Sequence, residues 1–348
     1  MKKVLALAII AVIMVGCFTL LSGCSSSPAP APNKPAANAP AAAGAKIMKV
    51  ASVNAKDRAL SQGFYKFKQY LDAELPGAFD VQIFTDGVLG DDSRTLEGLQ
   101  MNTIQASTVS TGPIAAFAPN IAVFDLPFLF KDRATAYKVL DGPLGQAQLD
   151  GLQNYGFVGL CYWENGFRQL SNSKRPVTAL ADIKGLKIRT LESPIHVDIW
   201  KALGANPTPM SYSQLYTALE EKVVDGQENP LANIVSSKFL EVQPYVTMTG
   251  HIYGASPFIL SKTFWNTLND KEKAAIKKAA LLAQKDERDL ALQEDVTAAK
   301  ALEAHKVKIS ELAPGEKEKM REAVQVIYSK YGAQFGPELM KEILDATK

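Results

Sequence analysis

Hydrophobic residues recur along this chain with two alternating periods. In some runs every second residue is apolar, as in half-buried strands, and in others apolar residues recur every three or four positions, as in helices. The strand-like runs cover residues 46–53, 79–86, 104–110 and 156–163. The helix-like runs cover residues 57–74, 91–101, 194–203 and 314–331. This alternation predicts an α/β fold in which helices cover a mainly parallel sheet.

Some of these predictions concern single side chains. The inward faces of the first two helices should carry Leu60, Phe64, Phe67, Leu71, Leu96 and Leu99. A later helix should bury Leu215, Leu219 and Val223. Ser193 should cap the helix that follows it, because serine is a favoured N-cap and Pro194 suits the first helical position.

The longest predicted helix covers residues 269–305. This run is charged and rich in alanine, and no Gly or Pro occurs between Phe258 and Ala313. Such a helix is too long for one small domain. A strand is predicted after it, over residues 305–312.

The length and composition fit a soluble globular protein with two domains. The chain has 348 residues, of which 47% are apolar and 21% are charged. Its formal net charge is +2, and removal of Lys2 and Lys3 with a leader would leave 38 − 2 = 36 basic residues against 36 acidic ones. A neutral chain does not favour nucleic acid as a partner, because binding it requires many phosphate contacts.

The first 45 residues predict a lipoprotein signal peptide followed by a tether. Residues 1–23 join a basic start to an apolar run, and the sequence LSGC at residues 21–24 has the form of a lipobox. Cleavage would make Cys24 the lipidated first residue and would anchor the protein to a membrane. Residues 24–45, rich in Pro and Ala, would hold the body away from that membrane. An uncleaved transmembrane anchor is the alternative, and Cys17 is a second candidate for lipidation.

Candidate binding chemistry is concentrated between residues 165 and 230. Arg168 and Arg189 lie 21 residues apart, each in a short strand-like segment, and Asn229 follows 40 residues later. Arginine suits a carboxylate because its planar guanidinium donates two parallel hydrogen bonds to the two oxygens. Asparagine adds one donor group and one acceptor at short range. These three side chains predict a site for a small organic acid.

The same stretch resembles one family of binding proteins. Its motifs are GLKIR at residues 185–189, GANPTPM at 204–210 and VDGQENP at 224–230. Their order and spacing are similar to those of TRAP (tripartite ATP-independent periplasmic) transporter substrate-binding proteins of the DctP type. The resemblance covers the chain from about Lys46 to its C-terminus.

The resemblance implies roles for particular side chains. Arg189 would bind the ligand carboxylate, Arg168 would also face the ligand, and Asn229 would be the third contact. Tyr212 matches an aromatic position of the cleft, although ordinary packing explains it equally well.

Other polar residues near the expected cleft have two interpretations each. Ser110 and Thr111 could donate to the ligand or only cap backbone groups. Asp92 could contact the ligand, although capping the following helix is the preferred interpretation. Sialic-acid-binding relatives carry Glu and Arg in the segment that matches residues 110–113, where this chain has STGP. The ligand is therefore expected to be a smaller or differently substituted acid.

The resemblance also implies an architecture. Two α/β lobes, as in periplasmic binding proteins, would enclose a ligand cleft, and the long helix would bridge both. Lobe I would comprise residues 46–165 and 255–294, and lobe II residues 166–254 and 295–348. Closure about a hinge would trap the ligand. The receptor would then deliver it to a TRAP membrane permease, a separate chain that uses an ion gradient.

Signatures of an enzyme are lacking. The chain has no G-x-S-x-G, Walker or G-x-G-x-x-G motif. Neither a cofactor nor a metal is predicted, because the histidines have no metal-ligand spacing; they are His196, His251 and His305. Nothing pairs the glutamates near the expected cleft as acid and base, so salt bridges or solvated surface are their expected roles; they are Glu164, Glu192 and Glu228. Cys161, in an apolar strand, should be buried and structural.

Two alternative functions stay open. The protein could be a sensor that presents its ligand-bound state to a membrane receptor. It could also be a lyase or hydrolase that acts on the same organic acid. An enzyme would change its ligand, whereas a receptor would return it unchanged.

Overall fold

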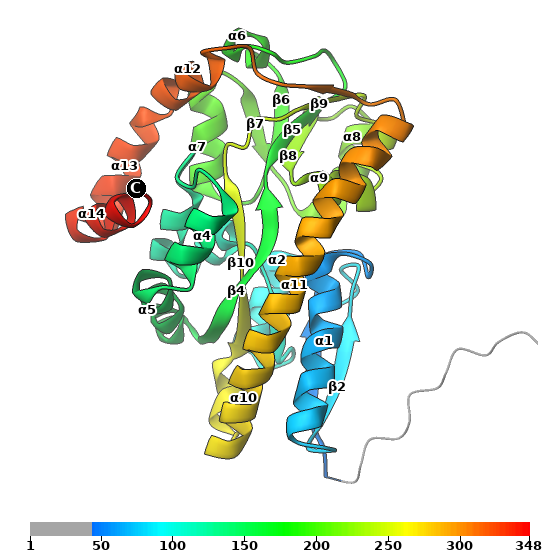
Figure 1. Ribbon diagram of the computed structural model, residues 1–348, viewed down its shortest axis with the longest axis vertical. Helices are drawn as coiled ribbons and strands as arrows, with labels where there is room; N and C mark the ends of the chain where they lie inside the picture. Colours follow the sequence, from blue (N-terminus) through cyan, green and yellow to red (C-terminus); the bar gives the residue numbers. More distant parts are fainter. Residues whose placement is uncertain (1–43) are drawn as a thin grey trace, which may run out of the picture. The chain divides into compact units, whose positions relative to one another are not determined.

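The computed structural model of the protein describes residues 44–348, which form two β-sheets flanked by helices (Figure 1). The first sheet has the strand order β2 (Phe79–Phe84), β1 (Lys46–Ala51), β3 (Ala106–Thr108), β10 (Tyr253–Ser261), β4 (Phe157–Phe167). The second has the order β11 (Lys308–Ser310), β9 (Tyr245–Thr247), β5 (Gln169–Asn172), β8 (Gly226–Asn229), β6 (Lys187–Thr190), β7 (Asn206–Pro209). The predicted α/β class is confirmed, and every predicted strand run contains a strand. The predicted leader and Cys24 lie outside the described residues.

Both sheets are mixed, which corrects the prediction of a mainly parallel sheet. β1 pairs in parallel with β2 and β3, and β6 with β7 and β8, as expected of β-α-β units. β4 and β10 instead run antiparallel, with Phe258 opposite Cys161. β4 leads at Arg168 directly into β5 of the second sheet, and β9 leads back into β10. This antiparallel pair connects the two sheets, and its pairing is not visible in local periodicity.

Helices cover the sheets and form most of the connections (Figure 1). The α-helices before β6 are α1 (Ala59–Glu74), α2 (Asp92–Gln100), α3 (Thr111–Ile114), α4 (Arg133–Leu140), α5 (Pro143–Gly151) and α6 (Leu180–Ile183). Those after it are α7 (Pro194–Ala202), α8 (Leu215–Glu220), α9 (Leu231–Ser236), α10 (Lys262–Asn266), α11 (Asp270–Ala304), α12 (Glu316–Ala323), α13 (Gln325–Phe335) and α14 (Pro337–Ala346). Short 3-10 helices are η1 (Pro119–Asp125), η2 (Leu152–Tyr155), η3 (Tyr212–Gln214) and η4 (Phe239–Glu241).

The inward faces predicted for α1 and α2 are confirmed, since all six of their apolar residues are buried. Leu215 and Leu219 of α8 are also buried, but Val223 is 53% exposed. This prediction is wrong because α8 ends at Glu220 and the chain turns at Lys222, which has a φ of 58°. Ser193 occupies the N-cap position of α7, but its hydroxyl makes no capping hydrogen bond.

The longest helix, α11, packs on both sheets, as predicted. Asn269 and Glu272 form a reciprocal capping box at its start. Its N-terminal half packs against α1 and β4, and its C-terminal half lies near α9 and β11. Small side chains such as Ala279 and Ala283 on the inward face are fully buried, which lets these elements approach closely. Cys161 is buried in the same contact, and its Sγ lies 3.6 Å from the carbonyl oxygen of Ala280.

Residues 314–331, predicted as one helix, form two helices instead, α12 and the first part of α13, and α14 follows them. α13 ends before Gly336, whose φ of 87° cannot continue a right-handed helix, and α14 begins at the next residue. The Tyr328 hydroxyl donates to the Pro127 carbonyl at 2.8 Å, and the Tyr331 hydroxyl donates to Asp198 on α7 at 2.9 Å. These helices contact elements next to both sheets, so the assignment of residues 295–348 to lobe II stays a prediction.

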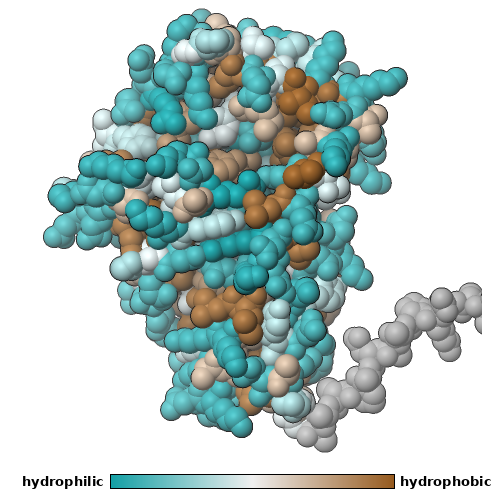
Figure 2. All heavy atoms as spheres, in the orientation of Figure 1, coloured by the Kyte–Doolittle hydropathy of each residue, from teal (hydrophilic) through white to brown (hydrophobic). Residues whose placement is uncertain are grey.

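The visible surface of the described residues is mainly hydrophilic, with separate small hydrophobic patches (Figure 2). The exposed large hydrophobic residues of α11 are Leu281, Leu282, Leu292 and Val296. None of the helices within residues 44–348 is both long enough and apolar enough to span a bilayer.

Candidate functional site

A small polar cavity lies where strand ends and helix starts from both sheets converge. Its empty volume, which includes space open to solvent, is about 360 Å³. Segments of the first sheet and its helices contribute Val53, Asn54, Asp92, Thr108, Ser110, Asn165 and Ser256. The junction with the second sheet and the second sheet itself contribute Arg168, Leu191, Tyr212, Asn229 and Asn233. Ten of these twelve side chains are polar, so the cavity suits a small polar ligand.

The structure brings together six of the seven residues predicted to contact a ligand. Five of them line the cavity: Asp92, Ser110, Arg168, Tyr212 and Asn229. The sixth, Arg189, lies beside the cavity, with its guanidinium carbon 6.0 Å from the ring centre of Tyr212. These residues come from six separate segments, so the fold assembles the site.

Thr111, the seventh residue, does not line the cavity, which corrects the prediction. It is buried in α3, and its hydroxyl donates to Asp125 Oδ1 at 2.5 Å. That hydroxyl therefore partners a protein carboxylate. Ser110, one residue earlier, faces the cavity and makes no capping hydrogen bond to α3.

Arg168 is fixed by acceptors on β8. The residue is 1% exposed, and its Nε and Nη2 donate to the Glu228 carboxylate at 2.5 and 2.9 Å. Nη2 also donates to Asn229 Oδ1 at 3.1 Å. Two-point pairing of this kind fixes the plane of the guanidinium. The described hydrogen bonds do not use Nη1, which can therefore serve a ligand.

Arg189, on β6, has a different environment. It is 1% exposed, and its Nε donates to the Met210 carbonyl at 2.8 Å. Its Nη1 is buried without a hydrogen-bond partner. Burial, assisted by the nearby charge of Arg168, lowers the pKa of Arg189 to about 10. The guanidinium is therefore charged at neutral pH, and a buried charge without a partner is costly unless an anion joins it.

Asp92 lies at the cavity edge in the first turn of α2, but it does not cap this helix as predicted. The cap is Asp91, whose Oδ1 accepts from the Arg94 backbone N–H at 3.0 Å. Burial raises the pKa of Asp92 to about 7, although the charges of Arg189 and Arg168 oppose this shift. Asp92 is therefore free to face the ligand and exchanges its proton near neutral pH.

A buried network of charged groups supports Arg168 from behind. His251 Nε2 lies 3.0 Å from Glu228 Oε2, and His196 Nδ1 lies 3.8 Å from Glu228 Oε1. Burial favours the neutral form of Glu228, but the charge of Arg168 and these neighbours hold its pKa well below the usual range. Glu228 therefore stays ionised and neutralises Arg168, in the salt-bridge role expected for it. No group of His, Cys, Asp and Glu side chains suited to a metal ion occurs within residues 44–348.

Sequence reasoning missed five polar residues of the cavity. They are Asn54, Thr108, Asn165, Asn233 and Ser256, and each is at most 7% exposed. Asn165 stands three residues before Arg168 in the segment already singled out, and Thr108 stands two residues before Ser110 in a predicted strand. The other three lie in different elements without a motif around them.

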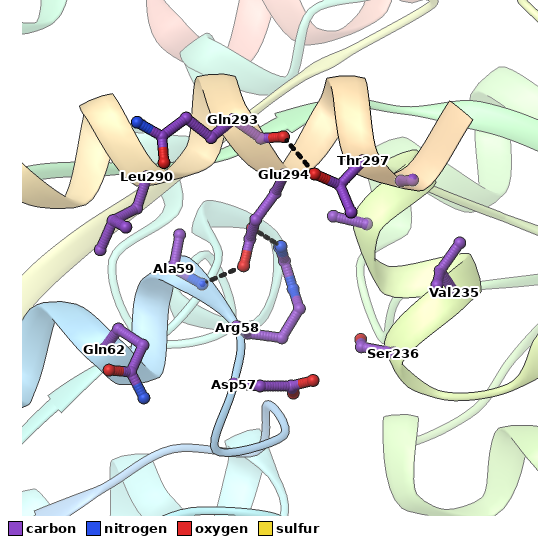
Figure 3. Close-up of a pocket in the computed structure, with 12 residues that line it drawn as sticks. Asp57, Arg58, Ala59, Gln62, Val235, Ser236, Leu290, Gln293, Glu294 and Thr297 are labelled. Carbon is purple, nitrogen blue, oxygen red and sulfur yellow. Dashed lines mark hydrogen bonds and ion pairs between the residues drawn. The ribbon is translucent and has the colours of Figure 1, made fainter. Parts of the chain in front are cut away.

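A larger hollow lies between α1, α9 and α11 (Figure 3), with an empty volume of about 750 Å³. Much of its wall is apolar, formed by Ala59, Ala232, Val235, Leu290 and Ala298. Arg58, the buried cation on this wall, is paired with Glu294 of α11. Because that charge is already neutralised, this hollow is a poorer site for an organic acid than the smaller cavity beside Arg189.

Comparisons with known proteins agree with this geometry. Residues 50–334 match the sequence profile of the family described as Bacterial extracellular solute-binding protein, family 7. The C4-dicarboxylate-binding periplasmic protein DctP of Rhodobacter capsulatus is 32% identical over 317 residues, which cover 90% of this chain and 94% of that protein.

Solved structures show the same architecture. The sugar acid binding protein DctPAm of Advenella mimigardefordensis, in complex with galactonate, has a TM-score of 0.85 and 40% identity, covering 87% of this chain and 98% of that one. A TRAP periplasmic solute binding protein of Polaromonas, bound to D-erythronate, has a TM-score of 0.83 and 35% identity, covering 86% and 98%. The two-lobed arrangement inferred from the sequence is thus that of solved proteins with organic acids bound.

Proposed function

Because this chain belongs to the bacterial extracellular solute-binding proteins of family 7, we propose that it is the solute receptor of a TRAP transporter. It captures a small organic acid outside the cytoplasm and delivers it to a membrane permease, a separate chain that uses an ion gradient. The three relatives named above bind galactonate, D-erythronate or C4-dicarboxylates, all of which carry a carboxylate.

The buried guanidinium of Arg189 is the observation that carries this proposal. Its Nη1 has no hydrogen-bond partner, whereas the charge of Arg168 is neutralised by Glu228. A ligand carboxylate beside Arg189 would replace the lost water and neutralise the charge in one step. Nη1 of Arg168 and the side chain of Tyr212 complete the binding surface on the same side.

The receptor carries out no chemistry on its ligand. The titratable side chains that line the cavity are Asp92, Arg168 and Tyr212, and no second carboxyl group of the described residues lines it as an acid–base partner. A lyase or hydrolase would need such a partner or an activated nucleophile. A ligand sensor would use the same cavity and differs only in its membrane partner.

An anchored receptor fits the leader inferred from the sequence. Lipid on Cys24 would hold the protein in the cell envelope, at the outer face of a membrane, and residues 25–45 would act as the tether. A receptor held in this way stays close to its permease.

A thermal-shift screen of purified protein against an organic-acid library tests the binding function. Binding to the native state raises the melting temperature by mass action, so a true ligand at 100 times its dissociation constant adds about 2.7 kcal/mol. Mass analysis after incubation should recover that acid unchanged. If no acid raises the melting temperature, the receptor function is wrong, and if the acid is recovered as a product, the protein is an enzyme.

A further inference from the structure

Arg58 stands between the two hollows of the protein. It is 2% exposed at the start of α1, where its Nη1 pairs with Glu294 of α11 (Figure 3). Its Nη2 donates to Asn165 Oδ1 at 3.0 Å and to Asn233 Oδ1 at 2.9 Å. Arg58 does not line the ligand cavity, but both asparagines do. It is therefore placed to act on the ligand through them.

Arg58 fixes which way these amides point. A guanidinium can only donate hydrogen bonds, so each asparagine must present its oxygen to Arg58 and turn its NH₂ group elsewhere. For Asn165, the NH₂ group has no partner among the described hydrogen bonds. For Asn233, the NH₂ group donates to Asn54 Oδ1 at 3.3 Å and to the Tyr212 hydroxyl at 3.2 Å.

The hydrogen bond from Asn233 to Asn54 also fixes which way the amide of Asn54 points. Because Asn54 accepts through Oδ1, its own NH₂ group is left for the cavity. Near these amides, the hydroxyl of Ser256 is buried without a partner, and Ser110 also lines the cavity. The cavity lining thus offers neutral donors, namely two amide NH₂ groups and two hydroxyls, together with the carboxyl group of Asp92. Such a mixture of donors and acceptors matches hydroxyl groups, which both donate and accept.

The charges around the cavity leave room for one anionic group. Glu228 neutralises Arg168, and Glu294 neutralises Arg58, so Arg189 is the arginine near the cavity without an acidic partner. Asp92 lines the same cavity and already supplies one acidic group. A second ligand carboxylate would lose its water next to this acid with no free cation to replace it, which is costly.

We infer that the ligand is a hydroxylated monocarboxylate, such as an aldonic acid, and that Arg58 is a positioning residue for the amides that recognise its hydroxyl groups. This inference rests on the proposed function, because it assumes that Arg189 binds a carboxylate. It goes further by separating hydroxylated monocarboxylates from the dicarboxylates and simple acids that the same arginine could hold.

Calorimetry with acids matched in length tests the ligand class. The four-carbon series contains erythronate, threonate, succinate and butanoate, and the six-carbon series contains gluconate, galactonate, adipate and hexanoate. We expect at least one hydroxylated acid to bind about tenfold or more tightly than the dicarboxylate and the unsubstituted acid of its length, a difference that one or two buried hydrogen bonds supply. A dicarboxylate that binds equally well or better overturns the inference and leaves the proposed function intact. If no acid in either series binds, the inference fails, and the screen of the organic-acid library decides separately whether the proposed function holds.

Variants of Arg58 and of the amides that it orients, namely Asn165, Asn233 and through Asn233 also Asn54, test the role of Arg58. Arg58→Lys keeps the charge opposite Glu294 but loses the fork that contacts two amides, and Asn54→Ala removes one NH₂ group without touching Arg58. Both should lower the affinity ratio of the hydroxylated acid to the unsubstituted acid of the same length by about fivefold or more. A general loss of folding would lower both affinities together and leave the ratio unchanged. Arg288→Lys is the matched control, since Arg288 pairs with Asp141 away from the cavity, and it should keep the wild-type ratio. If this affinity ratio is unchanged in both Arg58→Lys and Asn54→Ala, the amides do not recognise the hydroxyl groups of the ligand.

Discussion

Arg168 and Arg189 are equally buried but differ in the partner that the protein supplies. Arg168 donates to the carboxylate of Glu228 at two points, and Arg189 donates to one backbone carbonyl. Without ligand, Arg189 therefore lacks a compensating anion, which under the proposed function the ligand carboxylate would supply. At the residue scale, this difference predicts that the two arginines contribute unequally to binding.

Arg189→Lys should weaken binding of the ligand by roughly 2–5 kcal/mol, the range for disrupting one side of a buried charge pair. Lysine keeps the charge but loses the planar fork that matches two carboxylate oxygens. Arg168→Lys should cost less affinity, because Glu228 already engages most of its donors. Calorimetry with the acid found in the screen measures both, and Arg175→Lys on the exposed surface is the control. If Arg189→Lys folds normally and binds within a few-fold of wild type, another residue holds the carboxylate.

Asp92 should make the stability of the ligand-free protein depend on pH. Burial raises its pKa from 3.8 to about 7, so between these values the folded state binds more protons than the unfolded state. The stabilisation is complete below about pH 4 and is lost as the pH rises to 7. From pH 5 to pH 8, wild type should lose up to about 3 kcal/mol relative to Asp92→Asn, an upper bound because Asp92 is partly exposed. Urea unfolding at both pH values measures this, and parallel curves for the two proteins would contradict it.

At the scale of elements, close contact between helices α1 and α11 and strand β4 limits the side chains that fit. Gly63 of α1 faces this contact, and a Cβ atom there would lie 2.8 Å from the ring of the buried Trp163 and 3.1 Å from Glu287 of α11. The ring cannot move away, because it is packed against Phe64 and Phe258. The glycine is thus required for space, although alanine would be the better helix former.

Gly63→Ala should lower the free energy of unfolding by about 1 kcal/mol, because overpacking of 1–3 kcal/mol exceeds the gain in helix propensity of up to about 1 kcal/mol. Gly151→Ala is the matched control, since this helical glycine has nothing within 4 Å of its Cβ position. That substitution should be neutral or stabilise the protein by a few tenths to 1 kcal/mol. Denaturant unfolding measures both, and equal effects of the two substitutions would rule out the packing argument.

At the scale of the whole molecule, the ligand cavity takes its residues from both sheets. The sheets are joined by the β4–β5 and β9–β10 connections and by α11, and Arg58 reaches from α1 to Asn233 of α9. A change in the angle between the sheets would therefore open or close the cavity. This arrangement supports closure around the ligand, which is the state that a permease would have to recognise.

Saturation with the ligand should lower the radius of gyration in solution X-ray scattering, because closure brings the two sheets closer together. The comparison uses the same protein with and without the acid found in the screen, and Arg189→Lys at the same acid concentration is the control. A scattering curve that stays unchanged at saturation would show that the cavity binds its ligand without hinge closure.

Membrane attachment is a separate prediction at this scale. Cys24→Ser should abolish acylation and leave a larger, unprocessed precursor, because the lipobox cysteine is the site of both lipid attachment and cleavage. Metabolic labelling with a fatty acid, followed by electrophoresis, measures both effects, with Cys161→Ser as the control that should be labelled normally. Label that persists on Cys24→Ser would move the anchor to Cys17.

The sequence by itself determined the elements of the fold and the family. Helix and strand periods depend on neighbouring residues, so α1, α2 and the 35-residue α11 were predictable from local pattern. The two arginines were also predictable, because they stand in short motifs of fixed spacing. The local pattern was misleading where a turn ended an element early, as at Val223.

Tertiary structure alone decided the environment of each group in the cavity. Arg58 meets Asn233 across 175 residues of sequence, and Thr111 meets Asp125 where a ligand contact was expected. No period or motif encodes such pairs, because the partners belong to different elements whose distance is set by packing. The same reason explains why the sequence could place Arg189 in the site, whereas only the fold showed that it lacks an acidic partner.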